Sequence, residues 1–209
     1  MPDKSSDIVG VILAGGLSRR MNNQNKCFIP LNGKPLFEYV LEKLSPQCDT
    51  ILINSNEQNE RLAAYQLPIV KDSLEGFLGP LAGILSVMEW AKQHKPESKW
   101  ILTVPVDTPF LPDDLLSKLY QSVQTTHSEL ACACSLGRTH PVIGLWPTSL
   151  IDDLRLALTK EGMRKIDLWT SRYKISQQDF NNDNLDPFFN INCNEDLIKA
   201  ESLLKTLNN

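Results

Sequence analysis

The chain has 209 residues, 42% hydrophobic and 22% charged, which excludes a disordered or fibrous protein and predicts one domain over residues 1–209. Its net charge of −4 argues against a nucleic-acid-binding protein, which would carry a basic excess. No apolar run reaches the roughly 18 residues of a membrane span, the first residues are polar and the cysteines contain no C-x-x-C pair, so we expect a cytoplasmic protein without a membrane partner.

Strands and helices alternate through about the first 125 residues. The first strand is expected at Asp7–Leu13, because Val and Ile form a continuous run there, as in strands that are buried on both faces. A tight turn is expected at Asn32-Gly33, with helices at 35–44, 56–65, 81–93 and 111–123 and strands at 49–55, 67–72 and 99–107. This alternation predicts an α/β fold with three layers, αβα and Rossmann-like, in which a mainly parallel sheet lies between helices.

The second half of the chain is less regular. We expect two successive strands at 129–135 and 140–147, joined as a hairpin, and then an amphipathic helix at 149–162. The segment "FFNIN", residues 188–192, is predicted to be a last short strand, and 194–207 a terminal helix. No linker or low-complexity segment separates this half from the first, so we expect both in the same domain.

The stretch "ILAGGLSRRMNNQNK" (residues 12–26) follows the first predicted strand, at the edge of the sheet where α/β proteins bind ligands. Gly15 and Gly16 would let backbone amides approach a phosphate closely, and Arg19, Arg20 and Lys26 would neutralise it. The spacing matches neither G-x-G-x-x-G nor the P-loop. The residues alone therefore leave two readings open, a phosphate site and an ordinary turn with surface cations.

Five ordered blocks of sequence together resemble the molybdenum cofactor guanylyltransferases of bacteria, a branch of the nucleotidyltransferases that build activated sugars and cofactors. The blocks are "LAGGLSRRM", "DSLEGFLGPLAGILSVM", "PVDTPFLP", "HPVIGLW" and "FFNIN", and the resemblance runs from about residue 8 to residue 204. It implies an enzyme that uses Mg²⁺ to transfer GMP from GTP to the terminal phosphate of Mo-molybdopterin, forming molybdopterin guanine dinucleotide and pyrophosphate. It also implies a nucleotide-binding half at about 7–125 and an acceptor-binding half at about 126–209.

The resemblance also gives the first half of the chain its candidate site residues. Lys26 and Arg20 would hold the nucleotide phosphates and, with Asp107, form the catalytic set. Asp107 directly follows an apolar strand and would bind Mg²⁺, for which a carboxylate oxygen is a suitable ligand; its structural alternative is a turn cap before Pro109. The expected nucleotide-binding residues are Leu13, Ala14, Gly15, Gly16, Lys26, Asn54, Asp72 and Asp107.

Asn54 and Asp72 end the second and third predicted strands, at the same edge of the sheet. An Asp carboxylate can accept hydrogen bonds from both N1–H and N2–H of guanine, which adenine cannot match, so Asp72 is a candidate for base choice. The alternative is that each residue only caps its strand. Gly79, Pro80 and Gly83 would either let the nucleotide approach a helix start or simply shape that helix.

The acceptor side offers fewer candidates. Asn190 and Asn192 alternate in "FFNIN", so on a strand both would point to one face, and the resemblance makes them acceptor-binding residues. His140 is expected to be structural, because an acceptor phosphate is already ionised at neutral pH and needs no base. Arg164 and Lys165 would either meet the molybdopterin phosphate or form a solvated helix face.

The chain departs from the family pattern just before Lys26. The pattern has two glycines and an acidic residue there, whereas this chain has Asn22, Asn23 and Asn25. Asn tolerates a positive φ, so the loop can keep its path. Without an acidic neighbour, Lys26 is expected to be freer to engage phosphate.

Other functions stay open on the sequence alone. A related enzyme would transfer CMP or another nucleotide to a pterin or sugar phosphate with the same fold. A regulatory or scaffolding protein would need neither Lys26 nor Asp107, and a nucleotide-linked oxidoreductase would need a glycine fingerprint that is missing here. Besides GTP and molybdopterin, candidate partners are other proteins of molybdenum cofactor biosynthesis and the apo-enzymes that receive the product.

Overall fold

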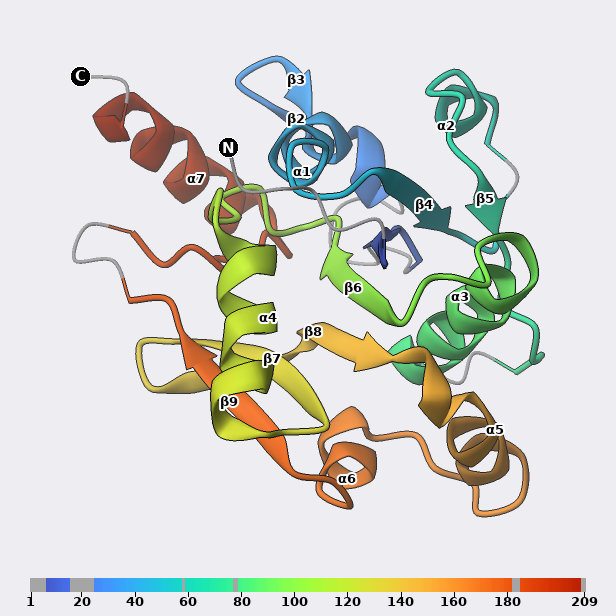
Figure 1. Cartoon of the computed structure of the whole chain (residues 1–209). Coiled ribbons are helices and arrows are strands. Elements are labelled where there is room, and N and C mark those ends of the chain that lie inside the picture. Colours follow the sequence, from blue (N-terminus) through green and yellow to red (C-terminus); the bar gives the residue numbers. More distant parts are fainter. Residues whose placement is uncertain (1–6, 16–24, 58, 77–78, 182–184, 208–209) are drawn as a thin grey trace.

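The computed structural model describes residues 7–15, 25–57, 59–76, 79–181 and 185–207, and a seven-stranded sheet lies at its centre (Figure 1). The strand order is β5-β4-β1-β6-β8-β7-β9. β8 runs antiparallel to both of its neighbours, and the other neighbouring pairs are parallel, which confirms a mainly parallel sheet and the β7–β8 hairpin. The strands are β1 (Ile8–Leu13), β4 (Thr50–Asn54), β5 (Ile69–Val70), β6 (Trp100–Pro105), β7 (Leu130–Ser135), β8 (Arg138–Pro147) and β9 (Ile175–Asp179).

Helices cover both faces of the sheet. Side chains of β1 alternate between the two sides: Ile8 and Ile12 pack with α1 and α4, and Val9 and Val11 pack with α3, α5 and α6. This arrangement confirms the predicted αβα layers. The helices are α1 (Leu36–Leu44), α2 (Glu60–Ala63), α3 (Pro80–His94), α4 (Leu115–Thr126), α5 (Ile151–Thr159), α6 (Ile166–Thr170) and α7 (Asn194–Leu207), with short 3₁₀ turns η1 (Lys26–Phe28) and η2 (Thr148–Leu150).

The parallel register brings the ends of three strands to one edge of the sheet. Leu13, the last residue of β1, lies opposite Asn54 of β4 and Pro105 of β6. Two backbone hydrogen bonds continue this pairing: the Ala14 N–H donates to the Asn54 carbonyl at 2.9 Å, and the Val106 N–H donates to the Leu13 carbonyl at 3.1 Å. The segments that follow these strands therefore start side by side.

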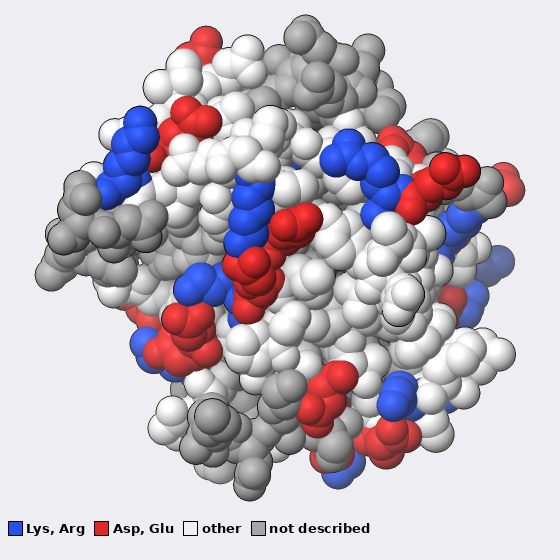
Figure 2. Space-filling model, turned by 90° about the horizontal axis from the view of Figure 1, so that it is seen from above, with Lys and Arg blue, Asp and Glu red and all other residues white. Residues whose placement is uncertain are grey.

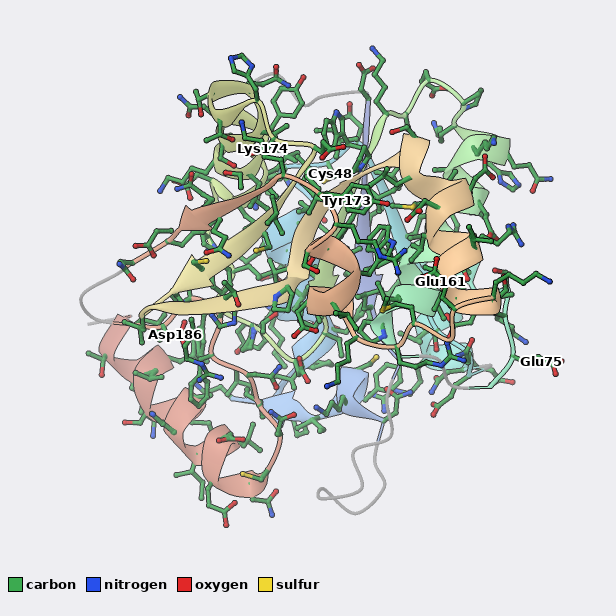
Figure 3. All side chains as sticks on the ribbon, turned by 90° about the horizontal axis from the view of Figure 1, so that it is seen from below. Cys48, Glu75, Glu161, Tyr173, Lys174 and Asp186 are labelled. Carbon is green, nitrogen blue, oxygen red and sulfur yellow. The ribbon has the colours of Figure 1, made fainter. Side chains whose placement is uncertain are left out.

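The predicted strand at 188–192 is wrong, and the sequence pattern missed β9 and α6. β9 takes the edge position beside β7, and the Lys174 carbonyl just before it accepts from the Glu129 N–H at 2.8 Å; Tyr173 and Lys174 are labelled in Figure 3. Residues 188–192 instead pass the end of β6, where the Ile191 N–H donates to the Asp107 carbonyl at 2.9 Å. "FFNIN" thus supports the ends of other strands without joining the sheet.

Two smaller expectations have clear outcomes. The turn at Asn32-Gly33 is confirmed: both residues have positive φ, 49° and 80°, and they join β2 (Pro30–Leu31) to β3 (Lys34–Pro35). The helix predicted at 56–65 is shorter, because Asn59 caps α2 by accepting from the Arg61 N–H at 2.9 Å. Residues before this cap are left free to line the site.

Surface charge does not by itself mark a functional site. On the face drawn in Figure 2, Lys and Arg side chains lie beside Asp and Glu, and uncharged surface separates these groups. We therefore look for the site in a cleft of the molecule.

Within the described ranges, no helix combines the length and the apolar character needed to cross a membrane.

Candidate active site

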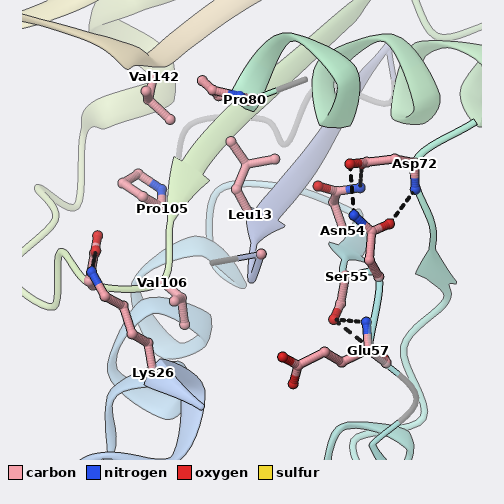
Figure 4. Close-up of a pocket in the computed structure, with 14 residues that line it drawn as sticks. Leu13, Lys26, Asn54, Ser55, Glu57, Asp72, Pro80, Pro105, Val106 and Val142 are labelled. Atoms are coloured by element: carbon pink, nitrogen blue, oxygen red, sulfur yellow. Dashed lines mark hydrogen bonds and ion pairs between the residues drawn. The ribbon is translucent and has the colours of Figure 1, made fainter. Parts of the chain in front are cut away.

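A cleft of about 720 Å³ opens where β1, β4 and β6 end (Figure 4). Predicted nucleotide-binding residues line it: Leu13, Gly15, Lys26, Asn54, Asp72 and Asp107, together with Gly79 and Pro80. Ala14 lies behind this wall in the hydrophobic core. Gly16, Arg19, Arg20, Asn22 and Asn23 lie outside the described residues. The glycine turn and the carboxylate after β6 therefore share one cleft, as the sequence predicted.

An ion pair forms one end of the cleft. Lys26 Nζ donates to Asp107 Oδ2 at 2.6 Å and to Asn192 Oδ1 at 2.6 Å, and Asn190 Nδ2 donates to Asp107 Oδ1 at 2.9 Å. The side chains of Lys26 and Asp107 are only 16% and 11% exposed, so this pair is screened less than a surface ion pair. The four side chains form one hydrogen-bonded cluster.

Local structure on both sides positions this cluster. Lys26 begins the 3₁₀ turn η1, which Asn25 caps by accepting from the Cys27 N–H at 2.9 Å. Asn25 Nδ2 also donates to Glu57 Oε2 at 2.7 Å, which links this turn to the loop after β4. The expectation that Lys26 is freer without an acidic neighbour in sequence stays a prediction; in the structure Asp107 supplies an acidic neighbour in space.

The second half of the chain lines the cleft with Val142 of β8, and its Asn190 and Asn192 contact the Lys26–Asp107 pair. Neither asparagine lies on a strand, yet both side chains meet the Lys26–Asp107 pair, so the prediction that they point the same way is confirmed for a different reason. The Asp196 carboxylate accepts from the backbone N–H of Asn192 at 2.9 Å. The start of α7 therefore holds this segment in place.

A network of amides and a carboxylate forms the other end of the cleft. Asn54 is only 6% exposed, and its Nδ2 donates to the Val70 carbonyl at 3.1 Å and to Asp72 Oδ1 at 3.0 Å. Asn56 Nδ2 donates to Asp72 Oδ2 at 2.8 Å, and the Asp72 N–H donates to Asn56 Oδ1 at 2.8 Å. Figure 4 shows Asn54 and Asp72 on neighbouring chain segments, joined by the bond from Asn54 Nδ2 to Asp72 Oδ1.

Gly83 of α3 lies directly behind Asn54. A Cβ added at Gly83 would stand 2.4 Å from Asn54 Oδ1, too close for any real contact. Gly79, just before α3, has a φ of 77°, which favours glycine, and Pro80 starts the helix. Gly83 therefore makes room for the Asn54 side chain, and Gly79 sets the turn into the helix.

Two of the remaining candidates point elsewhere. Arg164 donates from Nη1 to the carbonyls of Leu158 and Met163, at 3.2 and 2.6 Å, and neither Arg164 nor Lys165 lines the cleft. Both residues are exposed, so a solvated helix face fits this placement better than contact with the molybdopterin phosphate.

His140 is part of a separate hydrogen-bonded chain. Its Nε2 lies 2.8 Å from Ser135 Oγ, which donates to Asp186 Oδ1 at 2.7 Å, and its ring contacts Phe188. Burial lowers the pKa of His140. These contacts favour the structural role that the sequence suggested.

The cleft therefore combines an ammonium, a carboxylate and hydrogen-bonding amides. Burial raises the pKa of the neighbouring Cys27 thiol to about 12, so the thiol is protonated at neutral pH and unsuited to be a nucleophile. The described residues contain no group of three or more His, Cys, Asp or Glu side chains that could hold a metal ion by themselves. Asp107 Oδ2 and Asn192 Oδ1 nevertheless already converge on one cation, the Lys26 ammonium, and such oxygen atoms suit Mg²⁺.

Sequence reasoning missed three polar residues of the cleft, Ser55, Asn56 and Glu57, and three apolar ones, Pro105, Val106 and Val142. The polar residues follow Asn54 directly, but a helix was expected to begin at Asn56. The signal that could have found them is the N-x-N spacing at the end of a strand, which places two amides beside the same edge.

Comparisons of the sequence with known proteins agree with one another. A family model described as the MobA-like NTP transferase domain matches residues 10–173. The chain is 42% identical over 193 residues to the molybdenum cofactor guanylyltransferase of Rhodopseudomonas palustris (strain HaA2), covering 92% of this chain and 90% of that protein. It is 44% identical over 196 residues to the protein of the same name from Bradyrhizobium sp. (strain ORS 278), covering 94% and 92%.

Solved structures resemble the fold over nearly the whole chain. The molybdopterin-guanine dinucleotide biosynthesis protein A of Archaeoglobus fulgidus matches with a TM-score of 0.75 at 28% identity, covering 95% of this chain and 99% of that one. The 4-diphosphocytidyl-2C-methyl-D-erythritol synthase of Anaerococcus prevotii DSM 20548 matches with a TM-score of 0.72 at 15% identity, covering 95% and 96%. The second likeness shows the fold alone.

Proposed function

The chain belongs to the MobA-like NTP transferase family, and from this premise we propose that it transfers the GMP unit of GTP to the terminal phosphate of Mo-molybdopterin. The products are molybdopterin guanine dinucleotide and pyrophosphate. One observation of the structure carries the assignment to this cleft: Lys26 and Asp107 meet at one end of it and Asn54 and Asp72 at the other, and Gly15 also lines it. Cytidylyl transfer is the weaker alternative, because the cytidylyl relative reported above shares only the fold.

The reaction brings two anions together. An oxygen of the acceptor phosphate attacks the α-phosphorus of GTP, the bond from that phosphorus to the bridging oxygen breaks, and pyrophosphate leaves with the electron pair. Charge gathers on the α-phosphate and on the leaving group, so catalysis depends mainly on positioning and on positive charge. Among the described residues that line the cleft, Lys26 is the one with a positively charged side chain, and it can supply this charge.

In this proposal Lys26 changes partners when the nucleotide binds. Its ammonium now donates to Asp107 and Asn192, both at 2.6 Å. Triphosphate oxygens carry more negative charge than one carboxylate, so the ammonium moves to them and leaves Asp107 available. Arg20 is assigned to the phosphates by resemblance, and Gly15 offers backbone close to them.

The proposal includes Mg²⁺ as the metal ion. Asp107 would hold it, with Asn190 and Asn192 close by, and its chemistry would be to neutralise phosphate charge. Asp107 alone would not complete the coordination of Mg²⁺, so the phosphates of GTP would have to supply further oxygen ligands. The same two asparagines would contact the acceptor phosphate, and Asp72 would accept hydrogen bonds from N1–H and N2–H of guanine. We also place the enzyme in the cytoplasm, where thiols such as that of Cys27 persist in the reduced form.

The direct test is pyrophosphate release from GTP in the presence of Mo-molybdopterin and Mg²⁺. We expect Asp107→Ala to lower turnover about 10²- to 10³-fold, the usual cost of losing a charge-stabilising group. Asp113→Ala is the matched control, because Asp113 forms an exposed ion pair with Lys43 and should leave turnover unchanged. Normal turnover by Asp107→Ala, or faster turnover of the wild type with CTP than with GTP, would contradict the proposal.

A further inference from the structure

The side-chain amide of Asn56 forms two hydrogen bonds, one through its nitrogen and one through its oxygen, and both are with Asp72. Its Nδ2 donates to Asp72 Oδ2 at 2.8 Å, and its Oδ1 accepts from the Asp72 backbone N–H at 2.8 Å. Asn56 also lines the cleft, although its side chain is exposed. One side chain therefore fixes both the backbone and the carboxylate of Asp72.

The other oxygen of Asp72 is held as well. Asn54 Nδ2 donates to Asp72 Oδ1 at 3.0 Å, and Asn54 is itself fixed by the Val70 carbonyl and packed against Gly83. Both donors to the carboxylate are neutral amides, so they orient it without cancelling its charge. A carboxylate has about four lone-pair positions, and each oxygen therefore keeps capacity to accept a second hydrogen bond.

Such a carboxylate suits a base that presents two N–H groups side by side. Guanine does so with N1–H and N2–H, and accepting both requires the two oxygens of Asp72 to lie in a fixed plane. Rotation of the carboxylate would keep one bond and lose the other. The amide of Asn56 opposes this rotation at Oδ2, as the amide of Asn54 does at Oδ1.

We propose that Asn56 is a positioning residue for the choice of nucleobase, which acts through Asp72 by holding its carboxylate in the plane that accepts guanine. The inference rests on the proposed placement of guanine at Asp72. It assigns a role in specificity to a residue that touches the base only through its neighbour.

A merely structural role makes a different prediction. If Asn56 only ordered the loop, an oxygen that accepts from the Asp72 N–H would be enough for this role. Asn56→Asp keeps such an oxygen and would then keep the preference for GTP. If Asn56 positions the carboxylate, Asn56→Asp removes the donor and places a second negative charge against Asp72. Asn56→Ala removes donor and acceptor without adding charge.

The test is equilibrium binding of GTP and of ITP, whose base lacks the 2-amino group, to the full chain without an acceptor. We expect the wild type to bind GTP about tenfold more tightly than ITP, the usual effect of one hydrogen bond to a charged group. In Asn56→Ala this ratio should fall to about threefold or less, and in Asn56→Asp further. Asn59→Ala, in the same loop but bonded to the Arg61 N–H, should keep the wild-type ratio.

Asp72→Ala separates the possible failures. If Asp72→Ala abolishes the GTP preference and Asn56→Ala or Asn56→Asp keeps it, the positioning role is overturned and the base site stands. If Asp72→Ala keeps the preference, guanine does not lie at Asp72 and both claims fall. The test does not depend on the identity of the acceptor substrate, because it measures only the binding of nucleotides. Asn56→Ser gives the same reading if Asn56→Ala fails to fold.

Discussion

Asp107 and Asp72 lie at the two ends of the cleft, and of these two carboxylates only Asp107 bonds to a cation among the described residues. Asp107 bonds to the ammonium of Lys26 at 2.6 Å, whereas Asp72 bonds to the amides of Asn54 and Asn56 at 3.0 and 2.8 Å. An ammonium neutralises a carboxylate and leaves when a stronger anion binds it, while an amide only orients the carboxylate. We infer that Asp107 exchanges the Lys26 ammonium for Mg²⁺, whereas Asp72 recognises the base through hydrogen bonds in a fixed geometry.

The surroundings of the two carboxylates differ in the same sense. Asn54 lies on β4 and packs against Gly83 of α3, so two regular elements fix the Asp72 end. Asn190 and Asn192, beside Asp107, lie on a segment without regular structure. In the proposed mechanism Lys26 moves to the triphosphate, whereas Asp72 and its two amide partners keep their places.

The largest effect should follow from breaking the ion pair. In Lys26→Met we expect turnover to fall about 10²- to 10³-fold, because the substitution removes the positive charge of Lys26 from the cleft. The same variant should bind Mn²⁺, used as a probe for Mg²⁺, more tightly than the wild type when no nucleotide is present, because Asp107 is no longer paired. Titration of Mn²⁺ followed by electron paramagnetic resonance measures this.

Two matched variants check that result. Lys26→Arg keeps the positive charge and should bind Mn²⁺ as weakly as the wild type does. Lys34→Met removes an ion pair with Glu42 outside the cleft and should change neither turnover nor Mn²⁺ affinity. Weaker Mn²⁺ binding by Lys26→Met would show that the ammonium does not compete for Asp107.

A smaller effect should follow from changing the acceptor pattern at the other end. Asp72→Asn replaces one carboxylate oxygen by an N–H donor, which opposes guanine N2–H but suits the 2-oxo group of xanthine. We expect the preference between GTP and XTP, measured as the ratio of kcat/KM, to move towards XTP by about 10²-fold. An unchanged ratio would remove Asp72 from base recognition, while a loss of kcat alone would place Asp72 with the phosphate end.

The smallest effect should come from moving the support behind Asn54. In Gly83→Ala the added Cβ forces Asn54 away, at a cost of about 1–3 kcal/mol in unfolding free energy for an overpacked site. KM for GTP should rise several-fold, with kcat little changed. Lys92→Gly, at an exposed position of the same helix, is a control that destabilises α3 by about 1 kcal/mol and should leave KM alone. A normal KM in Gly83→Ala would mean that Asn54 does not set nucleotide affinity.

Most of the fold could be predicted because its signals are local. The continuous Val and Ile run of β1 and the alternation of strand and helix as far as α4 fix the parallel half of the sheet. β9 was missed because its residues, Ile-Ser-Gln-Gln-Asp, form a polar edge strand without apolar alternation. "FFNIN" has the apolar alternation of a strand, but its place at the end of β6 depends on contacts far away in the sequence.

The candidate site divides in the same way. Lys26, Asn54, Asp72 and Asp107 were predicted because each follows a strand or belongs to a quoted block, and all line the cleft. The pairing of Lys26 with Asp107 and the support that Asn56 gives to Asp72 could not be predicted, because each joins segments that only the folded chain brings together. These unpredicted contacts are the ones that distinguish the two ends.

We propose that one GTP molecule spans the cleft, with its base at Asp72, which the amides hold, and its triphosphate at the end where Lys26 pairs with Asp107. The most direct measurement is a crystal structure of the full chain soaked with GTP and Mg²⁺. We predict guanine N1 and N2 within hydrogen-bond distance of Asp72, the metal ion on Asp107, and Lys26 Nζ on phosphate oxygens. A nucleotide bound in the reverse direction, or one that leaves the Lys26–Asp107 bond intact, would contradict this account.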